Sequence, residues 1–188
     1  MRLKKAVDSL RPSLPMNKTV LGNAAAVLLA FALGAGVSAH AQSNEDNPDW
    51  KESDVPPAPA FDMGKLLTFS GAVSSSLTYG VDPSTIQISR NDGVVRYVLV
   101  AMNDSGAKNV MYEGIRCSTG EFRTYARYSS DGRWNVLSGS EWRTMFGNLP
   151  SKHALYLARA GVCDGSGPAT SVDIVVRRLK NPNFRYTE

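Results

Sequence analysis

The stretch Val94-Val-Arg-Tyr-Val-Leu-Val-Ala-Met102 and the stretch Lys108-Asn-Val-Met-Tyr-Glu-Gly-Ile-Arg-Cys117 decide the fold of this chain. The first is an almost continuous β-branched and apolar run, interrupted only by Arg96, which is typical of a buried strand. The residues between them, Asp104-Ser-Gly-Ala107, favour a turn. The sequence therefore predicts a long antiparallel hairpin at the centre of the domain.

More strands are predicted on both sides of this hairpin. Residues 85–89 alternate apolar and polar side chains, and Asp92-Gly93 is typical of a two-residue turn leading into Val94. A turn at Ser130-Asp-Gly132 separates two further runs. The strands expected besides the central pair are Leu66–Ser70, Thr85–Ser89, Glu121–Tyr128 and Arg133–Leu137.

These turns also predict a register. With the turn centred on Asp92-Gly93, Ile88 faces Tyr97, and with a four-residue loop at 104–107, Tyr97 faces Gly114. Arg96 and Glu113 then lie on the other face as diagonal neighbours and are expected to pair. The predicted core face consists of Ile86, Ile88, Tyr97, Leu99, Ala101, Val110 and Tyr112.

Helical patterns follow the strands. Ser140 can cap a short helix over Glu141–Phe146, and a second is expected from Pro150 to about Ala160, ended by Gly161. Val172, Val175, Val176 and Leu179 follow at helical spacing, with Ser171 as the cap. Strands first and helices last predict an α+β fold, with an antiparallel sheet of about five strands, two or three short helices and one disulfide.

The N-terminal region has the pattern of a secretion signal. Residues 23–37 are uncharged and too short to span a bilayer comfortably, and Ala39-His40-Ala41 offers small residues for a signal peptidase. Cleavage is expected after Ala41; an uncleaved anchor is the alternative. Translation can begin at Met1 or at Met16, which leaves a shorter leader. The protein is thus expected in the periplasm, with no stable membrane anchor after cleavage.

The remaining chain divides into a polar, proline-rich linker, residues 42–60, and a single domain, residues 61–188. Residues 1–41 contain five of the 21 Lys and Arg residues and one of the 17 acids, so the rest has 16 of each and is formally neutral. A neutral, exported domain argues against nucleic acid as a partner.

Cys117 and Cys163 are the only cysteines. In an oxidising compartment such a pair is first interpreted as a disulfide, with two unpaired thiols as the alternative. The 46-residue separation provides no Cys-x-x-Cys motif, so we expect a structural bond rather than a redox centre.

The chain contains the motifs Val81-Asp-Pro83, Asp92-Gly-Val-Val-Arg-Tyr97, Tyr112-Glu-Gly-Ile-Arg-Cys117, Arg123-x-Tyr125-Ala126, Gly132-x-Trp134, Trp142 and Cys163. Together they resemble the cryptic neisserial protein-like family of small exported bacterial proteins. The resemblance runs from about Trp50 to Leu179, and Tyr112-Glu-Gly-Ile-Arg-Cys117 is its most specific part. It implies a periplasmic location and contributes no catalytic residues. Some members are lipoproteins, whereas this chain lacks the lipid-accepting cysteine.

Few residues are available for catalysis. After cleavage His153 is the only histidine, and no Gly-x-Ser-x-Gly motif accompanies it, so we expect neither a metal site nor a serine triad and no cofactor. A pair of carboxylates remains possible in principle, with Glu113 or Asp131 as the candidates beside a second acid. Most of the acids sit in turns; those considered are Asp82, Asp92, Asp104, Glu113, Asp131 and Asp164.

Arginines and aromatic residues gather on or beside two adjacent predicted strands. Such clusters bind carboxylates, sugars or protein partners, and the alternative is a solvated sheet face with cation–π contacts. The sequence therefore predicts a non-enzymatic binding or accessory module of the cell envelope, with an unidentified envelope protein or cell-wall component as its partner. The alternative is a carboxylate-dependent hydrolase of peptidoglycan. The candidate binding face consists of Arg116, Arg123, Tyr125, Arg127 and Trp134.

Overall fold

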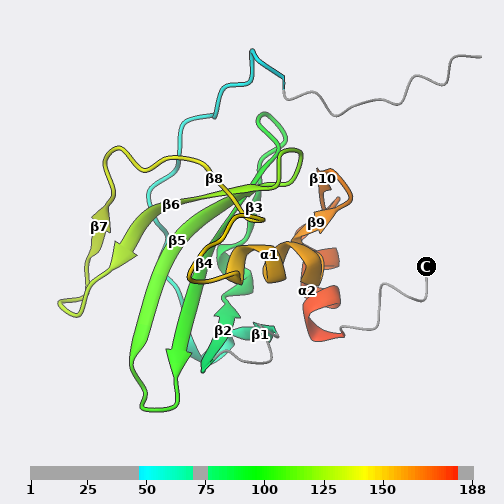
Figure 1. The fold of residues 1–188 in the computed structure, drawn as a ribbon. Helices are drawn as coiled ribbons and strands as arrows, with labels where there is room; N and C mark the ends of the chain where they lie inside the picture. The colour runs from blue at the N-terminus through cyan, green and yellow to red at the C-terminus, as the bar shows by residue number, and fades with distance from the viewer. Residues whose placement is uncertain (1–46, 70–75, 182–188) are drawn as a thin grey trace, which may run out of the picture. The chain divides into compact units, whose positions relative to one another are not determined.

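The structure, a computed structural model, describes residues 47–69 and 76–181 (Figure 1). The predicted signal peptide, its cleavage point after Ala41 and the first part of the predicted linker lie outside the described residues. Within the described ranges, no helix combines the length and apolar character needed to cross a membrane.

An antiparallel sheet of eight strands forms the centre of the fold, where about five strands were predicted (Figure 1). The main path runs β1-β2-β4-β5-β6-β7, while β3 pairs with β4 and β8 pairs with β6. The added strands are short or contain a glycine, so their sequence signals are weak. The strands are β1 (Leu67–Phe69), β2 (Leu77–Val81), β3 (Gln87–Ile88), β4 (Val94–Asn103), β5 (Lys108–Arg116), β6 (Glu121–Tyr128), β7 (Trp134–Val136) and β8 (Arg143–Thr144).

The predicted register is wrong by one position in the central hairpin. Tyr97 pairs with Glu113 rather than Gly114 because the loop contains three residues, 104–106, instead of the predicted four, and the backbone N–H of Asn103 donates to the carbonyl of Ala107. A shift of one residue moves every side chain of a strand to the other face. Val110 and Tyr112 therefore lie on the face opposite Tyr97.

The hairpin between β3 and β4 also differs from the prediction. Ile88 pairs with Val95, not Tyr97, because the turn contains four residues, 90–93, instead of two. Ser89 donates to the carbonyl of Val94 and closes this turn. The shift is by two residues, so Ile88 keeps the predicted face.

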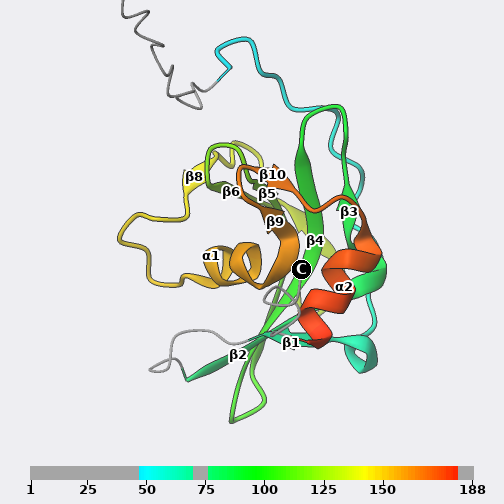
Figure 2. The same cartoon turned by 90° about the vertical axis from the view of Figure 1, so that its right-hand side faces the viewer.

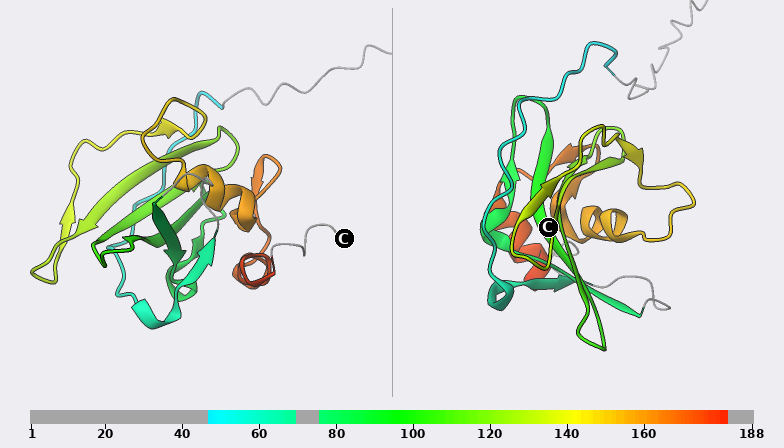
Figure 3. Two further views of the ribbon diagram at one scale, coloured as in Figure 1. Left: turned by 60° about the horizontal axis from the view of Figure 1, so that its bottom comes forward. Right: turned by 90° about the vertical axis from the view of Figure 1, so that its left-hand side faces the viewer.

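Each face of the sheet has its own apolar cluster. The larger cluster packs Tyr97, Leu99 and Ile115 against the helices. The smaller one includes Val98, Tyr112 and Tyr125 and is covered by chain from before β1. Figure 2 and the right panel of Figure 3 show α1 on one side of the sheet and the cyan N-terminal segment on the other.

The helical part follows the sheet. One helix, α1 (His153–Leu157), continues into a single wider turn, η3 (Ala158–Val162), and the other is α2 (Val172–Lys180) with Ser171 as its cap. The predicted helix over Glu141–Phe146 is wrong, since strand β8 lies there and pairs with β6. Two minor 3-10 turns, η1 (Met63–Lys65) and η2 (Pro83–Thr85), and a small hairpin of β9 (Cys163–Asp164) with β10 (Gly167–Pro168) complete the fold.

A disulfide joins the sheet to the helices. Cys117 follows the end of β5, and Cys163 follows η3, with 5.7 Å between their Cα atoms. The predicted disulfide is confirmed, and both cysteines are largely buried beside the larger apolar cluster.

Residues 50–61 lie along the sheet without regular secondary structure, and we call them the covering segment. Its two ends are anchored by aromatic side chains. The indole of Trp50 donates to the carbonyl of Asp92, and the ring of Phe61 packs edge-on against Tyr128 and Trp134. The segment therefore continues the smaller apolar cluster outward.

Candidate functional site

The five residues of the predicted binding face do not form one surface. Arg123, Tyr125 and Trp134 lie on the side of the covering segment, and Arg127 lies on the side of α1, where it lines a cavity with His153. Arg116 is nearly buried, with its guanidinium carbon 3.9 Å from the centre of the Trp50 ring. The bulge in β6 after Thr124 contributes to this division because it changes the alternation along the strand.

The covering segment brings one carboxylate into the arginine and aromatic cluster. The Oε1 atom of Glu52 accepts a hydrogen bond of 2.5 Å from Tyr125 and one of 3.1 Å from Arg96. Its Oε2 atom accepts from Arg123 at 2.8 Å and from the indole of Trp142 at 3.2 Å. Four side chains, from strands β4 and β6 and the loop before β8, thus donate to one carboxylate. Hydrogen bonds to an ionised carboxylate are stronger than neutral ones.

Asp92 provides the second carboxylate of this cluster. It accepts from Arg96 at 2.8 Å and from the backbone amides of Ser53 and Val94. Burial acts to raise the pKa of Asp92, but the hydrogen bonds, first that from Arg96, outweigh it and hold the pKa well below its usual range. Arg96 therefore has two carboxylate partners, and both act to keep its buried charge compensated.

Tyr125 reaches Glu52 by lying across Gly114. A Cβ atom at position 114 would collide with the hydroxyl of Tyr125, so this strand position requires glycine. Burial raises the pKa of Tyr125 strongly, and the hydrogen bond to Glu52 raises it further. The neutral phenol thus remains the donor to Glu52 at any ordinary pH.

A groove of about 460 Å³ separates part of the covering segment from the sheet. Arg123 provides its positive charge, and Tyr112, Tyr125 and Trp134 provide aromatic surface. The hydroxyl of Tyr112 is buried and has no hydrogen-bond partner within the described residues. An unpaired buried hydroxyl is costly, and the Tyr112 oxygen is not accessible from the groove in this structure. The other lining residues are Val55, Pro56, Pro57, Ala58, Ala126, Val136 and Leu137.

On the opposite face, Glu113 does not pair with Arg96 as predicted. It is fully buried and accepts hydrogen bonds from Thr124 at 2.8 Å and from Tyr97 at 3.4 Å. The Nε2 atom of His153 lies 2.8 Å from the same carboxylate. The one-residue register shift explains the change, because it places Glu113 beneath α1 and leaves Arg96 on the other side.

A chain of hydrogen bonds extends from Glu113 to a cavity. The Nδ1 atom of His153 lies 2.8 Å from the hydroxyl of Ser151, which lies 3.0 Å from the hydroxyl of Tyr79. Only the tertiary structure reveals this chain, because Tyr79, Glu113 and His153 are far apart in the sequence. The local signal was limited to Ser151, two residues before His153.

The remaining carboxylates are consistent with structural roles. Asp82 caps η2 by accepting from the backbone and hydroxyl of Ser84, and Asp131 pairs with Arg133 in an exposed turn. Neither Glu113 nor Asp131 lines the groove or the cavity beside His153. In the described part of the chain, no three His, Cys, Asp or Glu side chains come close enough together to hold a metal ion.

Comparison with known proteins gives a family match over most of the described residues. The sequence profile of the CNP1-like family matches residues 45–180. Cryptic neisserial protein 1 of Neisseria gonorrhoeae is 30% identical over 107 residues, covering 50% of this chain and 52% of that protein. The chain thus spans about half the length of the curated relative that it matches. No solved structure gives a significant match.

Proposed function

Because this chain belongs to the CNP1-like family, as its motifs indicated, we propose that it is an exported, non-enzymatic binding module of the bacterial cell envelope. Two features support this proposal. The first 41 residues have the composition of a cleavable secretion signal, and the domain contains a disulfide of the kind that persists in oxidising compartments.

The groove under the covering segment is the observation that carries the binding function. It combines aromatic surface with one arginine, and at about 460 Å³ it has the size of a small-ligand site. Val136 at its rim is 78% exposed and adds accessible apolar surface to the groove.

The ligand that fits this chemistry is a fragment of the cell wall. Aromatic side chains pack against the apolar faces of sugars, and the guanidinium of Arg123 can donate to a ligand carboxylate while it also donates to Glu52. Peptidoglycan fragments contain both sugar rings and peptide carboxylates. A neutral domain surface agrees with such a ligand better than with nucleic acid.

Binding is tested with purified muropeptides by isothermal titration calorimetry, using the oxidised protein. Val136→Asp places a charge at the rim of the groove and is expected to weaken binding about tenfold or more. Phe146→Asp is the matched control, since Phe146 is 62% exposed and lies away from this groove. Equal affinities of the two variants, or no binding by the unaltered protein, would contradict the proposal.

Export is tested separately. We expect the protein in the periplasmic fraction with Gln42 as its first residue, as determined by N-terminal sequencing. Retention in the cytoplasm, or a mature chain that keeps the apolar stretch 23–37, would contradict an exported soluble module.

A further inference from the structure

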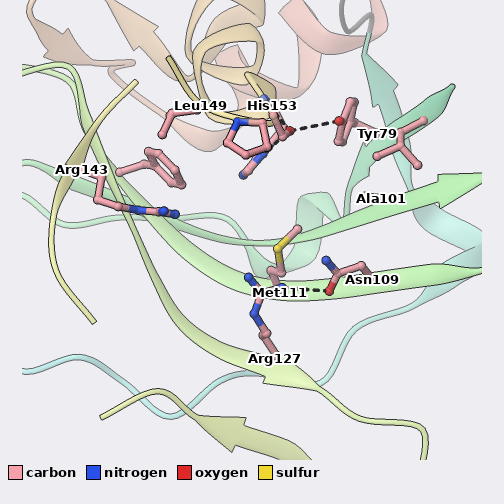
Figure 4. Close-up of a pocket in the computed structure, with 12 residues that line it drawn as sticks. Tyr79, Ala101, Asn109, Met111, Arg127, Arg143, Leu149 and His153 are labelled. Atoms are coloured by element: carbon pink, nitrogen blue, oxygen red, sulfur yellow. Dashed lines mark hydrogen bonds between the residues drawn. The ribbon is translucent and has the colours of Figure 1, made fainter. Parts of the chain in front are cut away.

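A second cavity lies on the other face of the sheet, between β2, β4, β5 and β6 and the loop that leads into α1 (Figure 4). It has a volume of about 250 Å³. Figure 4 shows His153 on one side of it, with Arg127 and Arg143 on the other sides. The apolar part of its lining comes from Leu77, Ala101, Met111, Phe122, Leu149 and Pro150.

The polar groups on the His153 side form hydrogen bonds with one another. Glu113 accepts from Tyr97 and Thr124, so as a carboxylate it also accepts the Nε2–H of His153. The Nδ1 atom of His153 lies within hydrogen-bond distance of the Ser151 hydroxyl, which in turn lies 3.0 Å from the hydroxyl of Tyr79. The polar groups on this side of the cavity therefore have hydrogen-bond partners within the protein.

The ring of His153 is held in place by its neighbours as well. It stacks on Tyr79 with 5.9 Å between ring centres and meets the edge of Phe122 at 5.5 Å. Packing and hydrogen bonds thus determine one orientation of the imidazole, which leaves a rigid wall for a ligand.

The opposite side carries positive charge that lacks a counterion. Arg127 makes one hydrogen bond, of 3.2 Å, to the side-chain oxygen of Asn109. Arg143 lies over the ring of Phe122, with 4.9 Å from its guanidinium carbon to the ring centre. Among the described residues neither arginine forms a salt bridge, and no Asp or Glu lines the cavity.

We propose that this cavity binds a small organic carboxylate, with its charge held between Arg127 and Arg143 and its apolar body against Met111 and Leu149. Two guanidinium groups facing an acid-free cavity supply donors in excess, and a carboxylate supplies the missing acceptors. The apolar lining and the volume favour a ligand with a short hydrocarbon portion over an inorganic anion. This site is separate from the groove under the covering segment, and each can fail without the other.

The test measures binding of a series of straight-chain carboxylates, from acetate to hexanoate, to the oxidised protein at low salt. Titration calorimetry gives the affinity, and the side-chain Nε–H signals of the arginines in NMR spectra report the place of binding. Affinity is expected to rise with chain length by roughly threefold for each methylene until the cavity is filled. Inorganic phosphate, which lacks an apolar body, is expected to bind more weakly.

Arg127→Gln and Arg143→Gln should each weaken carboxylate binding about tenfold. Both side chains are exposed, so the variants are expected to fold, which circular dichroism verifies. Arg90→Gln in the turn before β4 is the matched control and should bind as the unaltered protein does. The proposal is overturned if no carboxylate binds at millimolar concentration, if phosphate binds more tightly than hexanoate, or if all three variants bind equally.

Discussion

The hydroxyl of Tyr125 donates a 2.5 Å hydrogen bond to the carboxylate of Glu52, although 73 positions separate the two residues in the chain. Arg96, Arg123 and Trp142 donate to the same carboxylate. One side chain of the covering segment thus connects β4, β6 and the loop before β8. This relationship suggests the first of four predictions.

Replacing Glu52 with Gln is expected to lower the free energy of unfolding by about 1–3 kcal/mol. Arg96 is 3% exposed and would lose one of its two carboxylate partners, while Arg123 would lose its only salt bridge among the described residues. Urea unfolding measures the effect, and Glu141→Gln, at an exposed position, is the control. An unchanged midpoint for Glu52→Gln would show that the covering segment adds little to stability.

Gly114→Ala should destabilise the protein by about 1–3 kcal/mol, because the new methyl group meets the hydroxyl of Tyr125. Removing that hydroxyl relieves part of the collision. In the Tyr125→Phe background the same glycine substitution is therefore expected to cost less, and a double-mutant cycle in urea measures the coupling. Gly167→Ala is the control, since a Cβ there has its nearest neighbour at 3.8 Å. If the losses of stability from Gly114→Ala and Tyr125→Phe simply add, a collision between the new methyl group and the Tyr125 hydroxyl is contradicted.

Asp92→Asn should cost about 1.5–3 kcal/mol at pH 7, where the carboxylate accepts from Arg96 and two backbone amides. The pKa of Asp92 is lowered in the folded protein, so its contribution is present above the unfolded pKa of about 4 and is lost as the pH falls through the folded value.

The stability difference between the Asp92→Asn variant and the unaltered protein should therefore shrink below about pH 4. Urea unfolding at pH 7, 5 and 3 tests this expectation, with Asp104→Asn in an exposed turn as the control. A difference that is constant or grows toward pH 3 would mean that Asp92 does not act through its charge.

Replacing both cysteines with serine should lower the free energy of unfolding by about 4 kcal/mol, from the loop that the disulfide closes. Unfolding of the double variant in urea measures the loss. The native protein should resist alkylation until a reductant is added. Labelling of Cys117 and Cys163 without a reductant would contradict a disulfide in the protein as isolated.

The sequence predicted most reliably those elements whose signal is local. The spacing of Val172, Val175 and Leu179, with Ser171 as the cap, gave helix α2 nearly to the residue because all of its determinants lie within one helix. The disulfide followed in the same way from the count of two cysteines. The central hairpin was predicted for a similar reason, because β4 and β5 are consecutive in the chain and are joined by a short turn.

Register and partners depended on information that a local pattern does not contain. The length of the turn at 103–107 decided whether Glu113 lay beside Arg96 or beneath His153. In the sequence, Ser140 is a good cap for a helix over Glu141–Phe146. In the structure, the indole of Trp142 instead donates to Glu52, and the backbone N–H of Met145 donates to the carbonyl of Gly120. Tertiary contacts outweigh the local preference there.

The candidate binding face could be predicted only in part. Arg123, Tyr125 and Trp134 do lie on one side of the sheet, but no signal in residues 50–61 indicates that Glu52 would bind among them. The bulge in β6, which sends Arg127 to the other face, was equally hidden, because it has no glycine or other marker.

The position of Glu52 in the chain also constrains the order of assembly. Residue 52 leaves the ribosome early, yet its partners lie as far as Trp142, 90 residues later. The contacts of this early stretch with Asp92 and Arg96 can form before the sheet is fully synthesised, whereas its contact with Trp142 cannot. The covering segment precedes the sheet in the chain, yet its full set of contacts forms only after residues up to Trp142 have been synthesised.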